Sequence, residues 1–256
     1  MKRYIQAAII LSTGFFLLSR LVTGTLFFYI NQRFTWLILL AIAGFALVGF
    51  GYAFGKNEGH DHHHHHDDED CDHEHDHHHS HNLSWVSMLI VAAPVILGFL
   101  VPPQPLGASA MENREVNLGA VSGISLPGNS ETIQLKEGKE KDIMEWLQAF
   151  QRSTNEAEFV GEEAHVIGFV YRDGRFEDYP DTFMTSRFAL SCCVADATAI
   201  GLITEWPDAV TMDKDQWVEV KGHFKMGEFY GQQIPILVAE SITPTDTPDQ
   251  PYLYYY

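Results

Sequence analysis

Hydrophobic residues dominate the first 110 positions and form three long runs with few charges. Tyr4 to Ile30 contains one charged residue, Arg20, and is longer than the apolar core of a signal peptide, so we predict a membrane span, with a signal peptide as the alternative. Phe34 to Phe54 gives 21 residues without a charge, enough to cross a bilayer as a helix. Trp85 to Val101 gives 17 residues with Pro94 inside; we predict a third span, with a re-entrant or interfacial segment as the alternative.

After residue 110 the pattern changes to that of a soluble domain. Apolar residues at positions i, i+3, i+4 and i+7 predict one amphipathic helix over 139–151, with the stripe Ile143, Trp146, Leu147 and Phe150. Strand-like runs separated by turn residues predict five strands, at 164–171, 182–193, 200–204, 216–224 and 234–242. We therefore expect an α-helical membrane region followed by a mainly β domain, an OB-like small barrel with one helix, in which Gly168 and Gly222 allow strong bends.

These elements divide the chain into five parts. They are a transmembrane hairpin at 1–55, a loop at 56–84, a third transmembrane helix at 85–103, a linker with an early strand near 114–118 at 104–135, and the OB-like domain at 136–256. Three spans would place the loop and the domain on opposite sides of the cell membrane. Lys2, Arg3 and Lys56, weighed against Arg33 in the turn, place the N-terminus and the loop in the cytoplasm and the C-terminal domain outside.

The charge of the chain excludes one class of partner. The formal net charge is −18, and residues 111–256 contribute 11 basic and 25 acidic side chains to it. Binding to a phosphate backbone needs clustered Lys and Arg, so we expect no nucleic acid. We recognise no nucleophile, acid/base pair or phosphate loop, and we expect no enzymatic activity.

The loop between the second and third runs has the composition of a metal-binding segment. From His60 to His81 it holds twelve histidines, eight acidic residues and one cysteine, without Lys or Arg. Imidazole, carboxylate and thiolate groups suit divalent transition metals, with zinc as the first choice and nickel, cobalt or copper as others. No HExxH or CxxC spacing appears, which favours a flexible segment binding several ions; a solvated polar spacer is the alternative. The candidate ligands are His60, His62, His63, His64, His65, His66, Cys71, His73, His75, His77, His78, His79 and His81.

A second candidate metal site lies in the soluble domain. Cys192 and Cys193 would point to opposite faces of a regular strand, so both thiols reach one ion only if the strand ends there, and Asp196 suits such a turn. A Cys/Cys/Asp site, completed by His165 or His223, is one interpretation. Two buried thiols or a vicinal disulfide are the others, and each histidine taken singly is a strand residue.

Arg20 is a guanidinium within a hydrophobic run. Such a charge costs several kcal/mol in hydrocarbon unless it reaches the interface or finds a partner. Two interpretations stay open: the side chain extends to the interface, or it contacts a partner membrane protein.

Several segments together resemble one bacterial family. Besides the hairpin and the histidine loop, they are Arg-Phe-x-x-x-Cys-Cys-x-Ala-Asp-Ala at 187–197, Trp-Val-Glu-Val-Lys-Gly at 217–222 and Pro-Tyr-Leu-Tyr at 251–254. The chain resembles the YcgQ-like bacterial membrane proteins, described as the second subunit of a two-component permease and encoded beside a polytopic permease-like partner. The resemblance implies that Cys192, Cys193, Asp196 and Tyr252-Leu253-Tyr254 carry function.

Sequence and resemblance together predict an accessory subunit of a membrane permease that handles divalent transition metal ions, with the loop concentrating the metal. Three spans with one internal charge are too few for transport alone, so a polytopic partner or a homo-oligomer is implied. The alternative is a membrane-anchored metal-buffering or metal-sensing protein with no direct transport role.

Overall fold

The computed structural model describes residues 2–54, 85–112, 116–117 and 141–254. These residues form two compact units. The helical unit comprises Met1–Thr23 and Thr35–Pro103, and the barrel unit comprises Gly24–Phe34 and Gln104–Tyr256. The short connection between the first two helices therefore belongs to the barrel unit.

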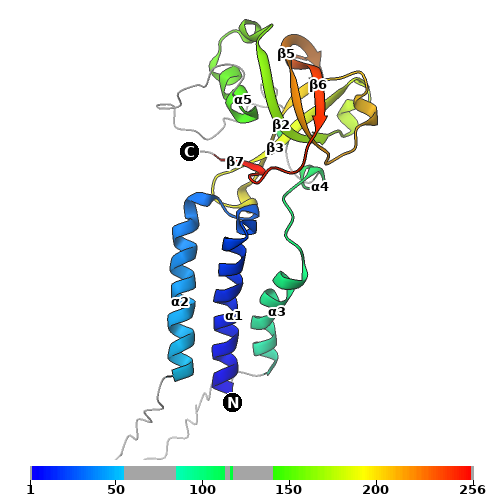
Figure 1. Ribbon diagram of the computed structural model, residues 1–256. Helices are drawn as coiled ribbons and strands as arrows, with labels where there is room; N and C mark the ends of the chain where they lie inside the picture. Colours follow the sequence, from blue (N-terminus) through cyan, green and yellow to red (C-terminus); the bar gives the residue numbers. More distant parts are fainter. Residues whose placement is uncertain (1, 55–84, 113–115, 118–140, 255–256) are drawn as a thin grey trace, which may run out of the picture. The chain divides into compact units, whose positions relative to one another are not determined.

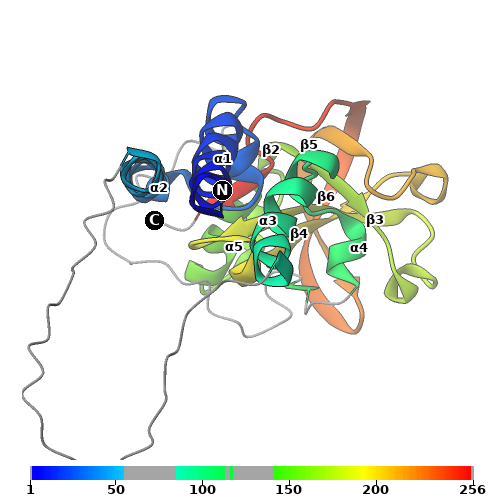
Figure 2. The same cartoon turned by 90° about the horizontal axis from the view of Figure 1, so that it is seen from below.

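The helical unit contains α1 (Lys2–Val22), α2 (Thr35–Phe54) and α3 (Trp85–Leu100), with α1 between the other two (Figures 1 and 2). Glycines bring the helices close together, as small residues do in membrane helix packing. A Cβ at Gly49 would lie 2.6 Å from Leu11, and a Cβ at Gly98 would lie 2.5 Å from the ring of Phe16.

Two helices are long and apolar enough to cross a membrane, Tyr4–Val22 and Gln32–Phe54. Most of their side chains are not buried within the protein, as expected of lipid-facing helices rather than of the core helices of a soluble protein. The first two predicted spans are present as apolar helices of spanning length, which supports a membrane location, but the first ends at Val22 and not at Ile30.

The prediction of three spans is not met in full. The third predicted span is an apolar helix, but α3 has 16 residues and ends before Pro102 and Pro103. At about 1.5 Å per residue it is about 24 Å long, shorter than the hydrocarbon core of about 30 Å. Among the described helices, two and not three have the length of a span.

The soluble helix of the barrel unit is α5 (Ile143–Arg152). Asp142 and Glu145 form a capping box, in which each side chain accepts a hydrogen bond from the other residue's backbone N–H, and this explains why the helix starts at Ile143. The predicted stripe is core packing: the rings of Trp146 and Phe224 are 4.7 Å apart in an edge-to-face arrangement.

Five strands close into a barrel. They are β2 (Glu163–Tyr171), β3 (Thr182–Leu190), β4 (Thr198–Glu205), β5 (Trp217–Phe229) and β6 (Gln232–Pro244). The pairing runs β4-β6-β5-β2-β3, and β3 pairs with β4 to close the ring. Only the β4–β6 pairing in this ring is parallel. In chain order the strands are arranged 1-2-3-5-4 around the barrel, which confirms the OB-like prediction.

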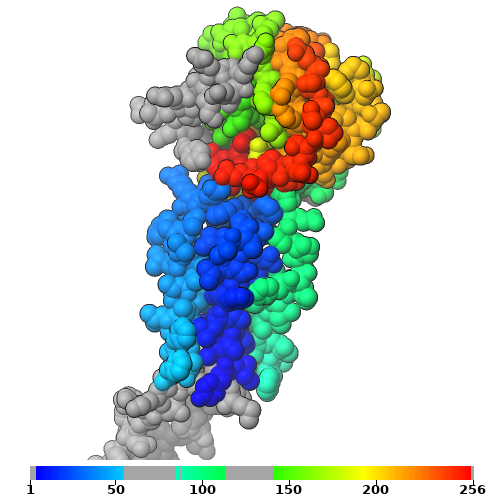
Figure 3. Space-filling view, in the orientation of Figure 1, coloured from blue at the N-terminus to red at the C-terminus, as the bar shows by residue number. Residues whose placement is uncertain are grey.

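Two short strands extend this sheet. β1 (Val116–Asn117) pairs with β4, and β7 (Tyr252–Tyr254) pairs in parallel with β3. The early strand near 114–118 is thus present as two described residues. Figure 3 shows the C-terminal residues, in red, lying along the surface of the barrel unit.

Glycine determines where two strands can approach. A Cβ at Gly168 would lie 2.6 Å from the carbonyl oxygen of Ser186 on the neighbouring strand. At Gly222 a Cβ would overlap the carbonyl oxygen of Val238, and the register between β5 and β6 shifts at this point. The register shift at Gly222 agrees with the bend predicted there, whereas at Gly168 the structure shows a close approach of two strands in regular register.

Candidate metal centre

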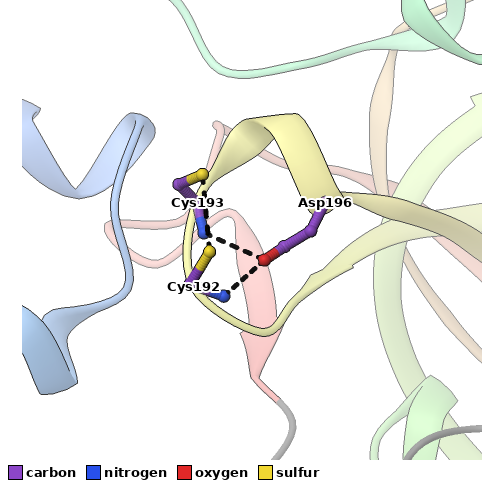
Figure 4. A group of neighbouring side chains, drawn as sticks. All are labelled: Cys192, Cys193 and Asp196. Atoms are coloured by element: carbon purple, nitrogen blue, oxygen red, sulfur yellow. Dashed lines mark hydrogen bonds between the residues drawn. The ribbon is translucent and has the colours of Figure 1, made fainter.

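The predicted strand at 182–193 ends earlier than expected, and this ending creates a candidate metal site. β3 stops at Leu190, and a 3₁₀ turn, η7 (Val194–Asp196), follows three residues later. The carboxylate of Asp196 accepts hydrogen bonds from the backbone N–H of Cys192 at 2.7 Å and Cys193 at 3.3 Å (Figure 4). It also accepts one from the Ser191 N–H at 3.0 Å. These N–H groups would otherwise continue the strand ladder, so Asp196 turns the chain.

The turn brings three potential ligands together. One ligand atom each from Cys192, Cys193 and Asp196 lie within 4.8 Å of one another, and the two sulfurs are 3.6 Å apart. Both cysteines are free thiols; Cys192 is exposed and Cys193 is half-buried. The condition for a shared site, that the strand ends at the cysteines, is met.

The sulfur spacing fits a tetrahedral ion. Two sulfurs 3.6 Å apart can each lie about 2.3 Å from one zinc ion, with an S–Zn–S angle of about 103°, near the tetrahedral value of about 109°. A linear two-thiolate site would instead need sulfurs about 4.6 Å apart. Two thiols and a carboxylate are also the ligand types that zinc accepts.

The carboxylate controls the charge of the site. The Cys192 thiol is hydrogen-bonded to the Asp196 carboxylate and also to the Cys193 sulfur. These two interactions, the first more than the second, raise the pKa of Cys192 to about 12. Partial burial alone would raise the pKa of Asp196, but hydrogen bonds from Cys192 and from the backbone outweigh it and lower that pKa. At neutral pH the carboxylate is therefore ionised beside a protonated thiol, and a cation that binds both must displace the thiol proton.

The two soluble-domain histidines do not join the thiols. His165 Nε2 lies 2.6 Å from Glu219 Oε1, and His223 Nδ1 lies 2.9 Å from Glu240 Oε1. Among the described residues the cluster contains Cys192, Cys193 and Asp196 alone. The hypothesis that either histidine completes the site is wrong. The loop ligands from His60 to His81, with Cys71, lie outside the described residues.

A contact that sequence reasoning missed joins this turn to the α1–α2 connection. The backbone N–H of Asn31 donates to the Cys192 carbonyl at 2.9 Å, and its side-chain Nδ2 donates to the Ser191 carbonyl at 2.9 Å. The Val194 N–H donates to the Tyr29 carbonyl at 3.0 Å, on either side of a β-bridge between Ile30 and Cys193. We predicted only that Arg33 lies in a turn between the first two spans; a polar Asn31 between two apolar runs was the available signal.

Tyr252 joins the same connection to two other segments. Its hydroxyl accepts a hydrogen bond from the Leu106 N–H at 2.8 Å and donates to the Phe28 carbonyl at 3.1 Å. The residue is 2% exposed, and it pairs with Phe188 on β3. One hydroxyl thus connects β7, the chain after α3 and the α1–α2 connection.

Arg187 holds the C-terminal segment against the barrel. Its Nε donates to the Pro251 carbonyl at 3.1 Å, Nη2 donates to the Gln250 carbonyl, and the guanidinium lies 5.4 Å from the ring centre of Trp217. Burial lowers the pKa of Arg187 to about 10, so the group stays charged at neutral pH.

Arg20 has a partner within the helical unit. Its guanidinium donates to the Gly98 carbonyl and lies 5.3 Å from the ring centre of Phe16. The Gly98 carbonyl would normally accept from the N–H four residues later, but that residue is Pro102, which has none. Arg20 therefore supplies the missing donor at the end of α3; contact with a partner protein stays a prediction.

Fold and site define a membrane-anchored protein whose OB-type domain carries an exposed dithiol–carboxylate turn. Residues 5–117 match the model of the DUF1980 N-terminal domain, and residues 125–255 match that of the DUF1980 C-terminal domain. The chain belongs to this family, and its predicted membership in the YcgQ-like proteins is confirmed.

Two curated relatives are similar to parts of the chain. A Streptococcus mutans protein named "Putative two-component membrane permease complex subunit" is 22% identical over 209 residues, 67% of this chain and 74% of the relative. The Bacillus subtilis protein named "UPF0703 protein YcgQ" is 28% identical over 100 residues, 38% of this chain and 34% of the relative. No solved structure matches.

Proposed function

We propose that the protein is an accessory subunit of a membrane permease that handles a divalent transition metal, with zinc as the first candidate. The observation that supports this best is the convergence of two thiols and a carboxylate on an exposed turn. The name of the Streptococcus mutans relative supports the permease assignment. The metal assignment depends on the ligand chemistry of the turn and of the loop at 60–81.

The site has the character of an exchange site. Structural zinc sites usually have four protein ligands, whereas sites that exchange a ligand keep one position open. The turn offers three ligands, and its thiols are exposed or half-buried. A fourth ligand from water or from a partner protein completes the shell, which suits a subunit that passes an ion on.

The helices support an accessory role rather than independent transport. The described helical unit provides two helices of spanning length and a third, shorter one. The Arg20 guanidinium of α1 donates a hydrogen bond to the Gly98 carbonyl of α3, within the same unit. A translocation path needs polar groups within the membrane, which a larger partner must supply. We propose a polytopic permease-like protein as that partner; association of several copies of this chain is the other possibility.

The connectivity supports a return crossing by α3. If α1 and α2 span, the connection between them, Gly24–Phe34, lies on the side of the bilayer opposite to Phe54. That connection belongs to the barrel unit, as do the residues after Pro103. The chain must therefore cross back between them, and α3 is the described apolar helix in this interval; bilayer thinning accommodates a short span. The loop at 56–84 and the dithiol turn would then lie on opposite sides, and the charges of Lys2, Arg3 and Lys56 favour a cytoplasmic loop.

Metal flux in cells tests the proposal. A strain lacking this protein would be complemented with the natural chain, with the Cys192→Ser plus Cys193→Ser variant, or with Val160→Ser plus Val210→Ser, two exposed residues outside the turn, as the matched control. We expect the first and third to restore zinc-65 movement across the membrane and the double variant not to. Deletion of the permease partner should give the same phenotype as deletion of this chain. Zinc binding by the purified chain without any effect on flux would instead support metal buffering or sensing.

A further inference from the structure

Asn31 is a buried polar residue in contact with the candidate metal turn. It is 2% exposed, although it lies in a short connection between two membrane helices. Its side-chain oxygen accepts a hydrogen bond from the Arg33 N–H at 3.0 Å. This bond orients the amide so that Nδ2 points to the Ser191 carbonyl, 2.9 Å away. Because the opposite orientation would place two oxygens together, the side chain has one favourable arrangement.

The backbone of the turn is held on two sides. On one side, Asp196 accepts the N–H groups of Ser191, Cys192 and Cys193. On the other, Asn31 donates to the carbonyls of Ser191 and Cys192. In the two peptide groups on either side of Cys192, both the N–H and the C=O therefore take part in hydrogen bonds. Two thiols on adjacent residues can share an ion only if the backbone between them keeps a particular conformation, since each sulfur is one bond beyond its Cβ.

We propose that Asn31 is a positioning residue of the metal site, acting through the backbone of Ser191 and Cys192, and that metal occupancy of the thiols stabilises the α1–α2 connection. This inference rests on the proposed function, because it assumes that the thiols bind a metal. Linkage is reciprocal. If the hydrogen bonds between the α1–α2 connection and the turn favour the geometry that binds the metal, then bound metal must in turn favour these hydrogen bonds. The connection is covalently continuous with α1 and α2, so the ion acts on the segment between the membrane helices.

Cobalt(II) titration of the full-length chain in detergent tests the positioning role. All loop histidines and Cys71 are replaced by serine, and thiolate coordination is followed by its charge-transfer absorption. Asn31→Asp keeps the oxygen that accepts from Arg33 and removes the donor to Ser191; Asn31→Ala removes both. We expect each variant to weaken cobalt binding about tenfold, the equivalent of about 1.4 kcal/mol. The added carboxylate of Asn31→Asp would by itself attract a cation, so weaker binding cannot arise from its charge.

A matched control separates positioning from general effects. Asn155→Asp makes the same chemical change at a residue whose side-chain oxygen likewise accepts from the backbone N–H two residues later, that of Ala157 at 3.2 Å. It should leave cobalt binding unchanged. A second measurement needs no change at Asn31: cobalt should slow hydrogen exchange of residues 24–34 by about tenfold, and it should not do so after Cys192→Ser plus Cys193→Ser.

The outcomes distinguish the two proposals. If the chain with Asn31 intact shows no thiolate-dependent cobalt absorption, the proposed metal site is wrong and the positioning role with it. If the absorption is present but Asn31→Asp binds cobalt as tightly as Asn31 does, and exchange of residues 24–34 is unaffected by cobalt, the positioning role alone is overturned. Weakened binding in both Asn31 variants, together with slowed exchange, supports it.

Discussion

Removing the hydroxyl of Tyr252 should loosen the attachment of three chain segments at once. Tyr252→Phe keeps the ring, which is 2% exposed, and deletes only the oxygen. That oxygen accepts from the Leu106 N–H at 2.8 Å and donates to the Phe28 carbonyl at 3.1 Å. The perturbation therefore changes hydrogen bonding without opening a cavity.

The magnitude follows from the two bonds. A hydrogen bond contributes about 0.5–1.5 kcal/mol net, and both partners of the hydroxyl are backbone groups that lose a protein partner. We expect the free energy of unfolding to fall by about 1–3 kcal/mol. In a chain of this size each kcal/mol corresponds to about 3 °C, so the midpoint of thermal unfolding should fall by about 3–9 °C.

Tryptophan fluorescence of the full-length chain during heating in detergent measures this change. Tyr179→Phe is the matched control, because its hydroxyl accepts one exposed hydrogen bond, from the Tyr230 N–H at 2.9 Å. The control should cost less than about 1 kcal/mol. Equal unfolding midpoints for Tyr252→Phe and the natural chain would refute the argument that this hydroxyl joins the three segments.

Three further substitutions test other parts of the structure. Gly222→Ala should destabilise the barrel by about 2–3 kcal/mol in denaturant unfolding, since its Cβ would overlap the Val238 carbonyl. Gly174→Ala should be nearly neutral, because its Cβ would only make ordinary contact with the Glu177 side chain at 3.9 Å. Arg20→Leu removes the donor to the end of α3 and should lower resistance to unfolding in dodecyl sulfate by about 1–3 kcal/mol; an unchanged curve would contradict the contact. Burial alone would raise the pKa of Asp173, but hydrogen bonds from Arg175 outweigh this effect and lower that pKa. The ionised Asp173 carboxylate therefore contributes folding stability above its unfolded pKa of about 3.9, and this stability is lost as pH falls through the lower pKa of the folded state. In the Asp173→Asn variant the free energy of unfolding should fall less on acidification below about pH 4, by a difference of less than about 1 kcal/mol.

The periodicity of apolar residues was sufficient to predict most of the barrel. The helical stripe lies in α5, and each of the five predicted ranges overlaps a strand, because runs of strand-forming residues between turn residues and one apolar helix face are properties of local sequence. The hairpin between β5 and β6 was underestimated. It extends to Phe229 and Gln232 through a turn at Tyr230 and Gly231, both with positive φ, and Tyr rarely adopts that conformation.

The end of β3 shows why the site was harder to predict. Residues 182–193 continue the apolar pattern, yet the strand stops at Leu190 because Asp196 captures three backbone N–H groups. Such a side-chain capture competes with strand pairing and leaves no periodic signal. The contact of Asn31 with the turn could not be predicted for another reason, since Asn31 and Ser191 are 160 positions apart in the chain.

Zinc content per chain tests the central claim most directly. The full-length protein with its loop histidines and Cys71 replaced by serine would be purified without chelator at neutral pH, equilibrated with zinc and measured by inductively coupled plasma mass spectrometry. We expect about one zinc ion per chain, lost when Cys192 and Cys193 are also replaced by serine. Equal zinc content with and without these two thiols would contradict a metal site on the turn.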